Sequence, residues 1–451
     1  MPKITISEKD LTVNNAIDVT ETIVFVPGMT TKAVATAPKL YRTTDEFVKD
    51  FGSTPYKFVN TQTDGATVTY LAAGEYERSY IYALELLNIG LPVYFYNVVQ
   101  INTSNDGSSV HNFYNKLTAT ENNAFQPVID RWLYNVKFIT SGGYATILDT
   151  TKSGSYGILQ TMLMAAAVRA DAIALADVSY NEDILTTSTN INENIAPKDP
   201  GYKIGPTTSD ICNLKFAAND KRKEEETTKY GAIVGPGGVY QVVEAHLTAN
   251  NINENNQIKM AGSFGYLLAL ANSIKIQKNP DYFAIAGVTR GFVPHLKSLT
   301  VEPTGADIEV AETKEKEKIS INPIVKVQPN FGYCIWGNRT LFPNPLVDLA
   351  ASSFLNIRVM SADVKKAIYN TCKKFTFETN STELWLNFKS EVEPLLEKMV
   401  ANGALEDFEL LKQKSTERAT LSVYVKLVTQ YAVEDFDITI GLTDSTVEEA
   451  L

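Results

Sequence analysis

Residues capable of acid–base or nucleophilic chemistry are few in this sequence and lie far apart. The three histidines, His111, His246 and His295, belong to no HExxH motif and to no HxE motif followed by CxxC, and no serine stands in a GxSxG motif. Enzymes need several reactive groups that converge on one place. We therefore expect structural or surface roles for the histidines and no catalytic residue among them.

Two aspartates offer another route to catalysis. Asp171 and Asp177 lie toward the two ends of an apolar segment, residues 172–178, that predicts a buried strand. Carboxylates at strand ends can act as general acids or bases. No partner for either one can be identified in the sequence, so helix capping or surface charge is the favoured role. The alternative that stays open is an α/β hydrolase-type enzyme whose site uses Asp171, Asp177 or Ser263.

Two short motifs resemble phosphate-binding elements, but each lacks a necessary feature. Residues 235–238 are Gly-Pro-Gly-Gly and follow an apolar run, yet the lysine of a GxxxxGK[ST] loop is missing and Pro236 has no backbone N–H to donate. Residues 221–223 are Lys-Arg-Lys, but three glutamates follow at once and cancel their charge. We expect no nucleotide, no other cofactor and no metal ion to be bound.

The overall composition excludes several further classes of function. The net charge of −11 argues against broad contact with nucleic acid or an anionic membrane. Polar residues and a proline interrupt the longest uncharged window, so we expect no membrane anchor. Cys212, Cys334 and Cys372 form neither a CxxC pair nor an even-numbered framework, which argues against zinc and disulfides. The first residues lack the basic and apolar segments of a secretory signal.

The elements that would position such residues follow a helix-then-strand order. With 451 residues and roughly 150 residues per domain, the chain has room for about three domains. Apolar runs alternate with amphipathic segments, and this order is typical of an α/β fold with a central, largely parallel sheet. We expect helices over residues 44–51, 77–88, 128–134, 157–169 and 260–274, strands over residues 22–26, 93–99, 136–140, 172–178, 230–234 and 282–288, a turn at Pro27-Gly28, and surface inserts near residues 186–210 and 303–318.

From residue 339 onward the pattern changes to that of an α+β module. Asn380, with Glu383 three residues later, predicts the start of a helix, and Gly403 predicts its end. Another apolar run follows over residues 421–428. We therefore expect a compact C-terminal α+β domain over residues 339–435, whose long helix carries one apolar stripe made of Leu384, Phe388, Val392, Leu395 and Met399.

Both ends of the sequence carry a short alternating strand beside polar residues. One lies in an N-terminal arm, residues 1–21, and the other in a C-terminal arm, residues 436–451. A strand with a whole apolar face must find a sheet, and such strands could complete a sheet in the same chain or in a neighbouring one. The apolar positions, which are the candidate residues for strand exchange between subunits, are Ile4, Ile6, Phe436, Ile438, Ile440 and Leu442.

Several segments resemble the contractile tail sheath proteins of bacteriophages and related contractile injection systems. Residues 26–28, Val-Pro-Gly, and residues 43–52 resemble that family's first strand, turn and helix. Further along, residues 336–341 resemble its GxRTL strand, residues 354–358 its VNVRR strand, and residues 375–405 its FxFE…W…GAL stretch. The resemblance covers residues 22–100 and 257–451, with Val359 standing where the family often has a second arginine and Lys32-Ala33 where it often has Gly-Pro.

The resemblance implies a structural protein and not an enzyme. Residues 22–338 would form a subtilisin-like sheath domain in which no Ser, His and Asp set can be matched, so protease activity does not carry over. Subunits of the family stack as six-fold rings around an inner tail tube, and their N- and C-terminal arms add strands to neighbouring subunits. The expected partners are further copies of the chain, the tube protein, the baseplate and the tail terminator.

The resemblance also implies a place and a mechanism of action. The subunit would assemble in the cytoplasm of a host bacterium, belong to the virion tail, and contract from a metastable extended state to drive the tube through a target envelope during genome ejection. The sheath of a tailocin or another injection system remains a second reading, since it differs in biology and not in physics.

Overall fold

The computed structural model of the chain describes residues 21–52, 58–63, 66–71, 78–101, 106–119, 121–144, 157–177, 228–241, 256–299, 302–303, 305, 308, 320–328, 332–342, 350–414 and 419–432. Contacts divide it into two units. The first, here unit 1, extends to Thr379, and the second, unit 2, begins at Asn380. Each unit is described by itself below.

Unit 1 is organised around a mixed, largely parallel sheet, as the helix-then-strand order predicts. The strands at its two edges are antiparallel to their neighbours, and the strands between them run parallel. When the parallel strands are numbered by their order along the chain, their order across the sheet is 2-1-3-4-5-6. This is the 2-1-3-4-5 order of doubly wound, flavodoxin-like sheets with a sixth strand added at the end. The order across the sheet is β13 (Gly332–Ile335), β12 (Asn322–Gln328), β8 (Gly231–Gly235), β7 (Ile173–Asp177), β6 (Phe138–Thr140), β1 (Val24–Thr30), β5 (Val93–Gln100) and β2 (Lys39–Tyr41).

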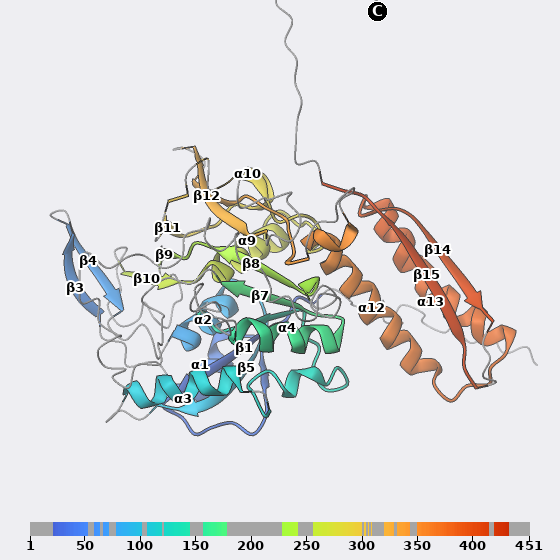
Figure 1. The fold of residues 1–451 in the computed structure, drawn as a ribbon, viewed down its shortest axis with the longest axis horizontal. Helices are drawn as coiled ribbons and strands as arrows, with labels where there is room; N and C mark the ends of the chain where they lie inside the picture. The colour runs from blue at the N-terminus through green and yellow to red at the C-terminus, as the bar shows by residue number, and fades with distance from the viewer. Residues whose placement is uncertain are drawn as a thin grey trace, which may run out of the picture. The chain divides into compact units, whose positions relative to one another are not determined.

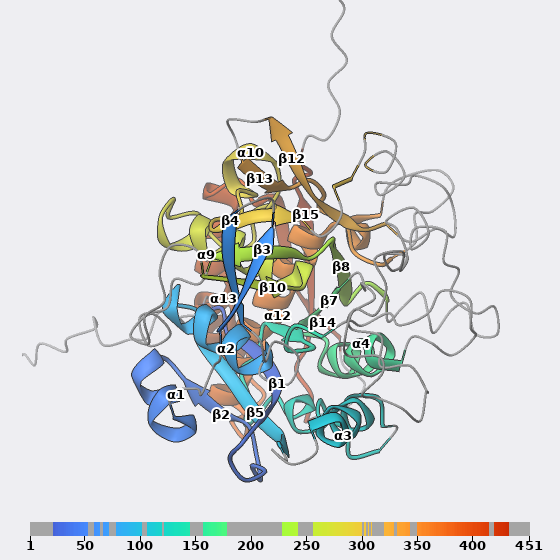
Figure 2. The same cartoon turned by 90° about the vertical axis from the view of Figure 1, so that its left-hand side faces the viewer.

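Helices cover both faces of this sheet (Figures 1 and 2). On one face α2 (Arg78–Asn88) packs with α9 (Gly262–Lys275), and on the other α3 (Asp106–Thr118) packs with α4 (Gly157–Arg169). Because both faces are covered, the central strands are mostly apolar and do not alternate, and polar residues occur at their ends. All seven residues of β1 are buried, and so are all five of β7.

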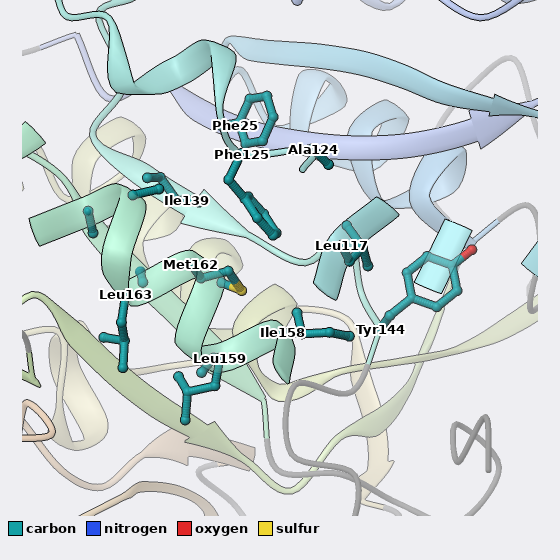
Figure 3. Packing of buried hydrophobic residues seen from close by; sticks show 14 of the residues in the cluster. Phe25, Leu117, Ala124, Phe125, Ile139, Tyr144, Ile158, Leu159, Met162 and Leu163 are labelled. Carbon is teal, nitrogen blue, oxygen red and sulfur yellow. The ribbon is translucent and has the colours of Figure 1, made fainter. Parts of the chain in front are cut away.

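A large apolar cluster lies between the sheet and the α3–α4 pair (Figure 3). Phe25 from β1 meets Phe125 edge-on, with ring centroids 6.1 Å apart. Leu117 from α3 and Met162 from α4 close the cluster, and all four side chains are essentially inaccessible to solvent. This cluster fixes the two helices against the sheet.

Several smaller elements complete unit 1. The helix α1 (Thr44–Phe51) begins at Thr43, whose hydroxyl accepts the N–H of Glu46, and ends at Gly52, as predicted. Long α12 (Leu355–Phe375) is the last helix of the unit. The remaining elements are a second sheet in the order β11 (Leu296–Leu299), β9 (Gly238–Gln241), β10 (Asn256–Met260), β4 (Ala66–Leu71) and β3 (Phe58–Thr63), and the short helices α10 (Gly287–Arg290), η2 (Pro127–Ile129) and η5 (Ala351–Ser353).

Unit 2 is a helix with a hairpin. The helix α13 (Thr382–Ala401) packs against β14 (Leu405–Gln413), which pairs antiparallel with β15 (Ser422–Thr429). Its helix begins at Ser381, whose hydroxyl accepts the N–H of Leu384, and not at the predicted Asn380. The predicted apolar stripe is confirmed except at Leu395, since Leu396 is the buried residue at that turn. The strand β14 was not predicted.

The first strand passes through the predicted turn at Pro27-Gly28. β1 continues to Thr30, with a bulge after Gly28 that shifts its register against β5. A bulge accommodates a proline, which has no N–H for the ladder. Gly28 is required because a Cβ there would lie 2.2 Å from the ring of Phe95. The turn prediction was therefore wrong, and the residues that suggested it serve close packing.

Three further local predictions were wrong. Residues 282–288 are no strand: Gly287 has a φ of 75°, which an extended strand does not allow. Residues 354–358, likened to a strand, instead begin the buried helix α12, where Leu355, Ile357 and Val359 are all inaccessible. Of residues 128–134 only the first part is helical, as the short η2.

Other predicted segments have limited support. Residues 336–341 contain no strand, although Arg339 forms an isolated bridge with Phe354. Among the described residues, no helix has both the length and the apolar character that a membrane span requires. The predicted domain boundary after residue 338 stays a prediction, and α12 belongs to unit 1 by its contacts. Insert 186–210 and nearly all of 303–318 lie outside the described residues.

Candidate functional site

Asp177 and Ser263, two of the three residues of the enzymatic alternative, come together at the carboxyl end of β7. The Oδ1 atom of Asp177 accepts the backbone N–H of Ser263 at 2.5 Å, and its Oδ2 atom accepts the Ser263 hydroxyl at 3.0 Å. Tyr82 from α2 places its hydroxyl 2.9 Å from that of Ser263. None of the three side chains is exposed to solvent, and burial raises the pKa of Tyr82 well above its usual value.

This arrangement is a helix anchor. The first turn of a helix leaves backbone N–H groups without partners, and the N-cap residue of α9, Ala261, has no side chain that can accept one. Asp177 supplies the missing acceptor and places its negative charge at the positive end of the helix dipole. The geometry therefore favours the capping role predicted for such carboxylates over a reactive one.

Asp171 is held separately from the Asp177 cluster. It stands before β7, whereas Asp177 ends that strand, and it pairs with Arg169, with Nε 2.9 Å from Oδ1. Arg169 is almost fully buried and also donates to the carbonyl of Val128. The structure thus divides the predicted trio into a helix cap and an ion pair. Within the described part of the chain, no three His, Cys, Asp or Glu side chains are grouped as metal ligands.

A second buried polar cluster fastens α12 to the central sheet. Lys137, beside the first residue of β6, lies 2.7 Å from Asp363 of α12 and also pairs with Asp281. Lys366, one turn further along α12, donates to the carbonyl of Val136 at 2.7 Å. Lys137 and Asp363 are wholly inaccessible, so the contact between this helix and the sheet is ionic as well as apolar.

Burial and neighbouring charges shift the pKa values in this cluster in opposing directions. Burial acts to lower the pKa of Lys137, but Asp363 and Asp281 outweigh it and raise that pKa. Burial raises the pKa of Asp363 itself to about 7; the nearby carboxylate of Asp281 adds to the rise, and Lys137 and Lys366 oppose it without cancelling it. Sequence reasoning missed the cluster, although a lysine inside the apolar run 136–140 was a usable signal.

Unit 2 offers a surface of a different kind. Phe408 and Leu410 of β14 turn one face of the hairpin toward α13, and Leu410 is buried. Successive side chains of a strand point to opposite faces, so Leu411 and its cross-strand partner Tyr424 lie on the other face, where each is 46% exposed. We call this side the open face of the hairpin; it comprises Asp407, Glu409, Leu411, Tyr424, Lys426 and Val428.

The edges of the hairpin are open as well. Among the described residues, β14 pairs only with β15, so each strand has one edge without a neighbour. A two-stranded sheet is at best marginally stable alone, and an unpaired edge is a template for a further strand. The hairpin is therefore well suited to accept a strand.

The predicted donor residues cannot be placed. Ile4, Ile6, Phe436, Ile438, Ile440 and Leu442 all lie outside the described residues. The sequence itself shows that the C-terminal four follow the hairpin closely, since β15 ends at Thr429. Their role in strand exchange stays a prediction.

Comparison with known proteins confirms the resemblance. No family model matches the chain. A tail sheath protein of Vibrio phage KVP40 is 25% identical over 184 residues, which are 39% of this chain and 25% of that protein, so the match spans about a quarter of the relative's length.

The fold is shared over nearly the whole chain with components of contractile systems. A chain from the cryo-EM structure of the anti-feeding prophage baseplate in its contracted state superposes with a TM-score of 0.63 at 15% identity, covering 98% of both chains. A chain of an extracellular contractile injection system, in the PVC sheath complex in its contracted state, gives a TM-score of 0.54 at 14% identity and covers 99% of this chain and 98% of that one.

Proposed function

We propose that this chain is a structural tail sheath subunit, which polymerises as stacked rings around an inner tail tube and contracts to drive that tube through a target cell envelope. The observation that carries the proposal is the coverage of the fold likeness to a sheath complex, which extends over 99% of this chain. Sequence similarity to a phage tail sheath protein supports it independently.

Contraction in this proposal is a change between two packings of the same subunits. The extended packing is metastable, and the free energy released at subunit interfaces supplies the work once a baseplate trigger frees the first ring. No nucleotide and no active site is needed, so we propose that the chain is not an enzyme. The buried position of the Asp177 cluster agrees with this, because no substrate can reach it.

Strand exchange would keep subunits connected while they move. Backbone hydrogen bonds of an added strand need no particular side chain, so they persist as subunits rotate, and an alternating apolar face fixes the register. In this proposal the open edges of β14 and β15 accept strands, and the donors are Ile4 and Ile6 of one arm and Phe436, Ile438, Ile440 and Leu442 of the other.

The finer assignments belong to the same proposal. They include a subtilisin-like relationship of the α/β domain, an α+β C-terminal domain, six-fold rings, and contacts with tube, baseplate and tail terminator. Assembly would take place in the host bacterial cytoplasm, with the finished subunit in a virion tail. The sheath subunit of a tailocin or of another injection system would assemble and contract by the same mechanism.

Electron microscopy of the purified chain tests the proposal. Tubes or stacked rings are expected from the full chain and not from versions that lack residues 1–20 or 436–451. Two double variants give a sharper test. The first replaces two apolar arm residues, Ile438→Asn with Ile440→Asn, and the control replaces their polar neighbours, Asp437→Asn with Thr439→Asn. The apolar pair should abolish tubes and the polar pair should leave them. A compact monomer or dimer that trimming does not change would refute the sheath assignment.

A further inference from the structure

A surface group of aromatic and basic side chains lies on unit 1 beside the Lys137–Asp363 cluster, with its residues on the segment before β6 and on α12. Trp132 and Leu133 are 68% and 69% exposed. Tyr369 of α12 meets Trp132 edge-on, with centroids 5.8 Å apart. Lys373 lies 4.3 Å from the Trp132 ring centroid and 4.5 Å from that of Tyr369, and Arg131 lies 4.9 Å from Tyr369. We call these five residues the basic-aromatic patch.

The patch is ordered before any partner binds. The Oδ1 atom of Asp130 accepts the backbone N–H of Trp132 at 2.8 Å, which fixes the loop, and Lys373 lies against two aromatic rings at once. Cation–π contacts of this kind hold a cation in place over an aromatic face. Preordered Trp, Tyr and Arg side chains are those that dominate binding at protein interfaces, because little conformational entropy remains to be lost.

The charge of the patch selects its partner. Two cations stand out from a chain whose net charge is −11, so another copy of the same chain is an electrostatically suitable partner. Complementary charges across an interface increase the rate of association and fix its register.

The open face of the hairpin has the complementary chemistry. Asp407 and Glu409 of this face are exposed, and so is Glu406, which lies beside them at the bulge; within the face as defined, Lys426, opposite Glu409, carries the one positive charge. Leu411 and Tyr424 provide exposed apolar area beside these carboxylates. The face thus offers carboxylates to Arg131 and Lys373, and apolar surface to Trp132.

We propose that the basic-aromatic patch of one copy binds the open face of the β14–β15 hairpin of a second copy. This contact joins two different surfaces, and where each copy uses them toward two different neighbours, such head-to-tail contacts generate rings or helical assemblies. The inference rests on the proposed function and adds a side-chain contact that is separate from strand exchange along the hairpin edges.

Charge reversal tests the contact. The patch variant carries Arg131→Glu and Lys373→Glu, and the hairpin variant carries Glu406→Lys and Asp407→Lys, which leaves the Glu409–Lys426 pair intact. Each variant alone should raise the protein concentration needed for half-maximal assembly by about tenfold or more, as loss of interface anchors does. Light scattering with electron microscopy measures this, and circular dichroism reports whether each variant is folded.

Mixing the variants shows whether the contact joins two copies. An equimolar mixture restores both opposite-charge contacts between alternate subunits, so it should assemble near the wild-type concentration. The four substitutions combined in one chain should restore assembly as well. Rescue in that combined chain without rescue in the mixture would mean that the two surfaces meet within one copy, and it would overturn the proposal.

Controls separate this inference from the proposed function. Lys49→Glu with Lys116→Glu reverses two other exposed lysines of unit 1 and should leave assembly close to wild type. A wild-type chain that never forms rings or tubes would refute the sheath function itself. Normal assembly of both reversal variants, or loss of assembly that neither combination rescues, would overturn only the patch–hairpin contact.

Discussion

The central sheet of unit 1 and the hairpin of unit 2 solve the problem of an exposed strand in opposite ways. The central sheet has helices on both faces and antiparallel strands at its edges, and β1, β7 and β8 are buried along their whole length. The hairpin has one helix on one face, and no residue of β15 is fully buried. Among the residues that the structure describes, the central sheet is covered on both faces, whereas the hairpin has an uncovered face and open edges.

This difference indicates where stability and where assembly reside. Buried apolar area is the main source of folding free energy, so most of it lies in unit 1. A thin sheet with open edges contributes less, but it can gain area from a partner. The following expectations test that division, and each is made for unassembled protein.

Truncation of a core side chain should separate the units most clearly. Phe25→Ala opens a cavity between β1, Phe125 and Met162, and we expect a loss of about 3–5 kcal/mol in the free energy of unfolding of unit 1. Leu410→Ala, on the covered face of the hairpin, should cost about 2 kcal/mol in unit 2, since a thin site can collapse. Chemical denaturation measures both. An equal cost at the two positions would contradict the comparison.

Removal of the buried cation should have a comparable effect. Lys137→Met leaves Asp281 and Asp363 close together without their shared cation, and we expect a loss of about 3–5 kcal/mol in unit 1. Pairing it with Asp363→Asn should recover part of the loss because one carboxylate is then neutral. A double-mutant cycle by urea denaturation gives the coupling, and strictly additive losses would argue against the ion network.

The same cluster predicts a pH dependence of known sign. Burial raises the pKa of Asp363 from its ordinary 3.8 to about 7, so between these values the folded chain holds a proton that the unfolded chain has lost. The raised pKa of Asp363 therefore adds to the free energy of unfolding below pH 3.8, and this contribution is lost as the pH rises toward 7. The free energy of unfolding should fall by at most about 1.4 kcal/mol per pH unit. Asp363→Asn should remove this slope from urea denaturation curves between pH 4.5 and 6.5.

Helix caps give the smallest expected effects, one in each unit. Ser381→Ala and Thr43→Ala each remove a side-chain acceptor from a first helical turn, and each should cost about 1 kcal/mol. The chain has three tryptophans, of which only Trp385 lies in unit 2. Trp132→Phe with Trp336→Phe therefore leaves a fluorescence probe of unit 2, and Trp385→Phe leaves one of unit 1. A cap variant that shifts both probes equally would show that the units unfold together.

Sequence patterns predicted several helices of unit 1, but not α3 or the beginning of α12. The helix-then-strand order gave α1, α2, α4 and α9 within one or two residues, and it gave the parallel strands between them. These helices and strands could be predicted because each of them coincides with one long apolar or periodic run in the sequence. Periodicity fails for segments buried on every side: residues 354–358 have the apolar content of a strand, yet they begin α12.

Strand β14 shows a different limit. Its inward residues Leu405, Phe408 and Leu410 are spaced by three and then two, because the register against β15 shifts between Leu405 and Asp407. A bulge inserts one residue and reverses the alternation, so no regular period marks the strand. Contacts between residues far apart in the sequence could not be predicted either. Asp177 and Ser263 are 86 positions apart, and only the fold shows that Asp177 caps α9, the helix to which Ser263 belongs.

The length of the hairpin has a mechanical consequence. β15 has eight residues paired along β14, a ladder roughly 27 Å long at about 3.4 Å per residue. A strand laid along either edge and pulled along its own axis would load all its hydrogen bonds in shear at the same moment, whereas a pull across the edge would open them one by one. Tensile strength in such a link would therefore depend on the direction of the force, high along the strands and low across them.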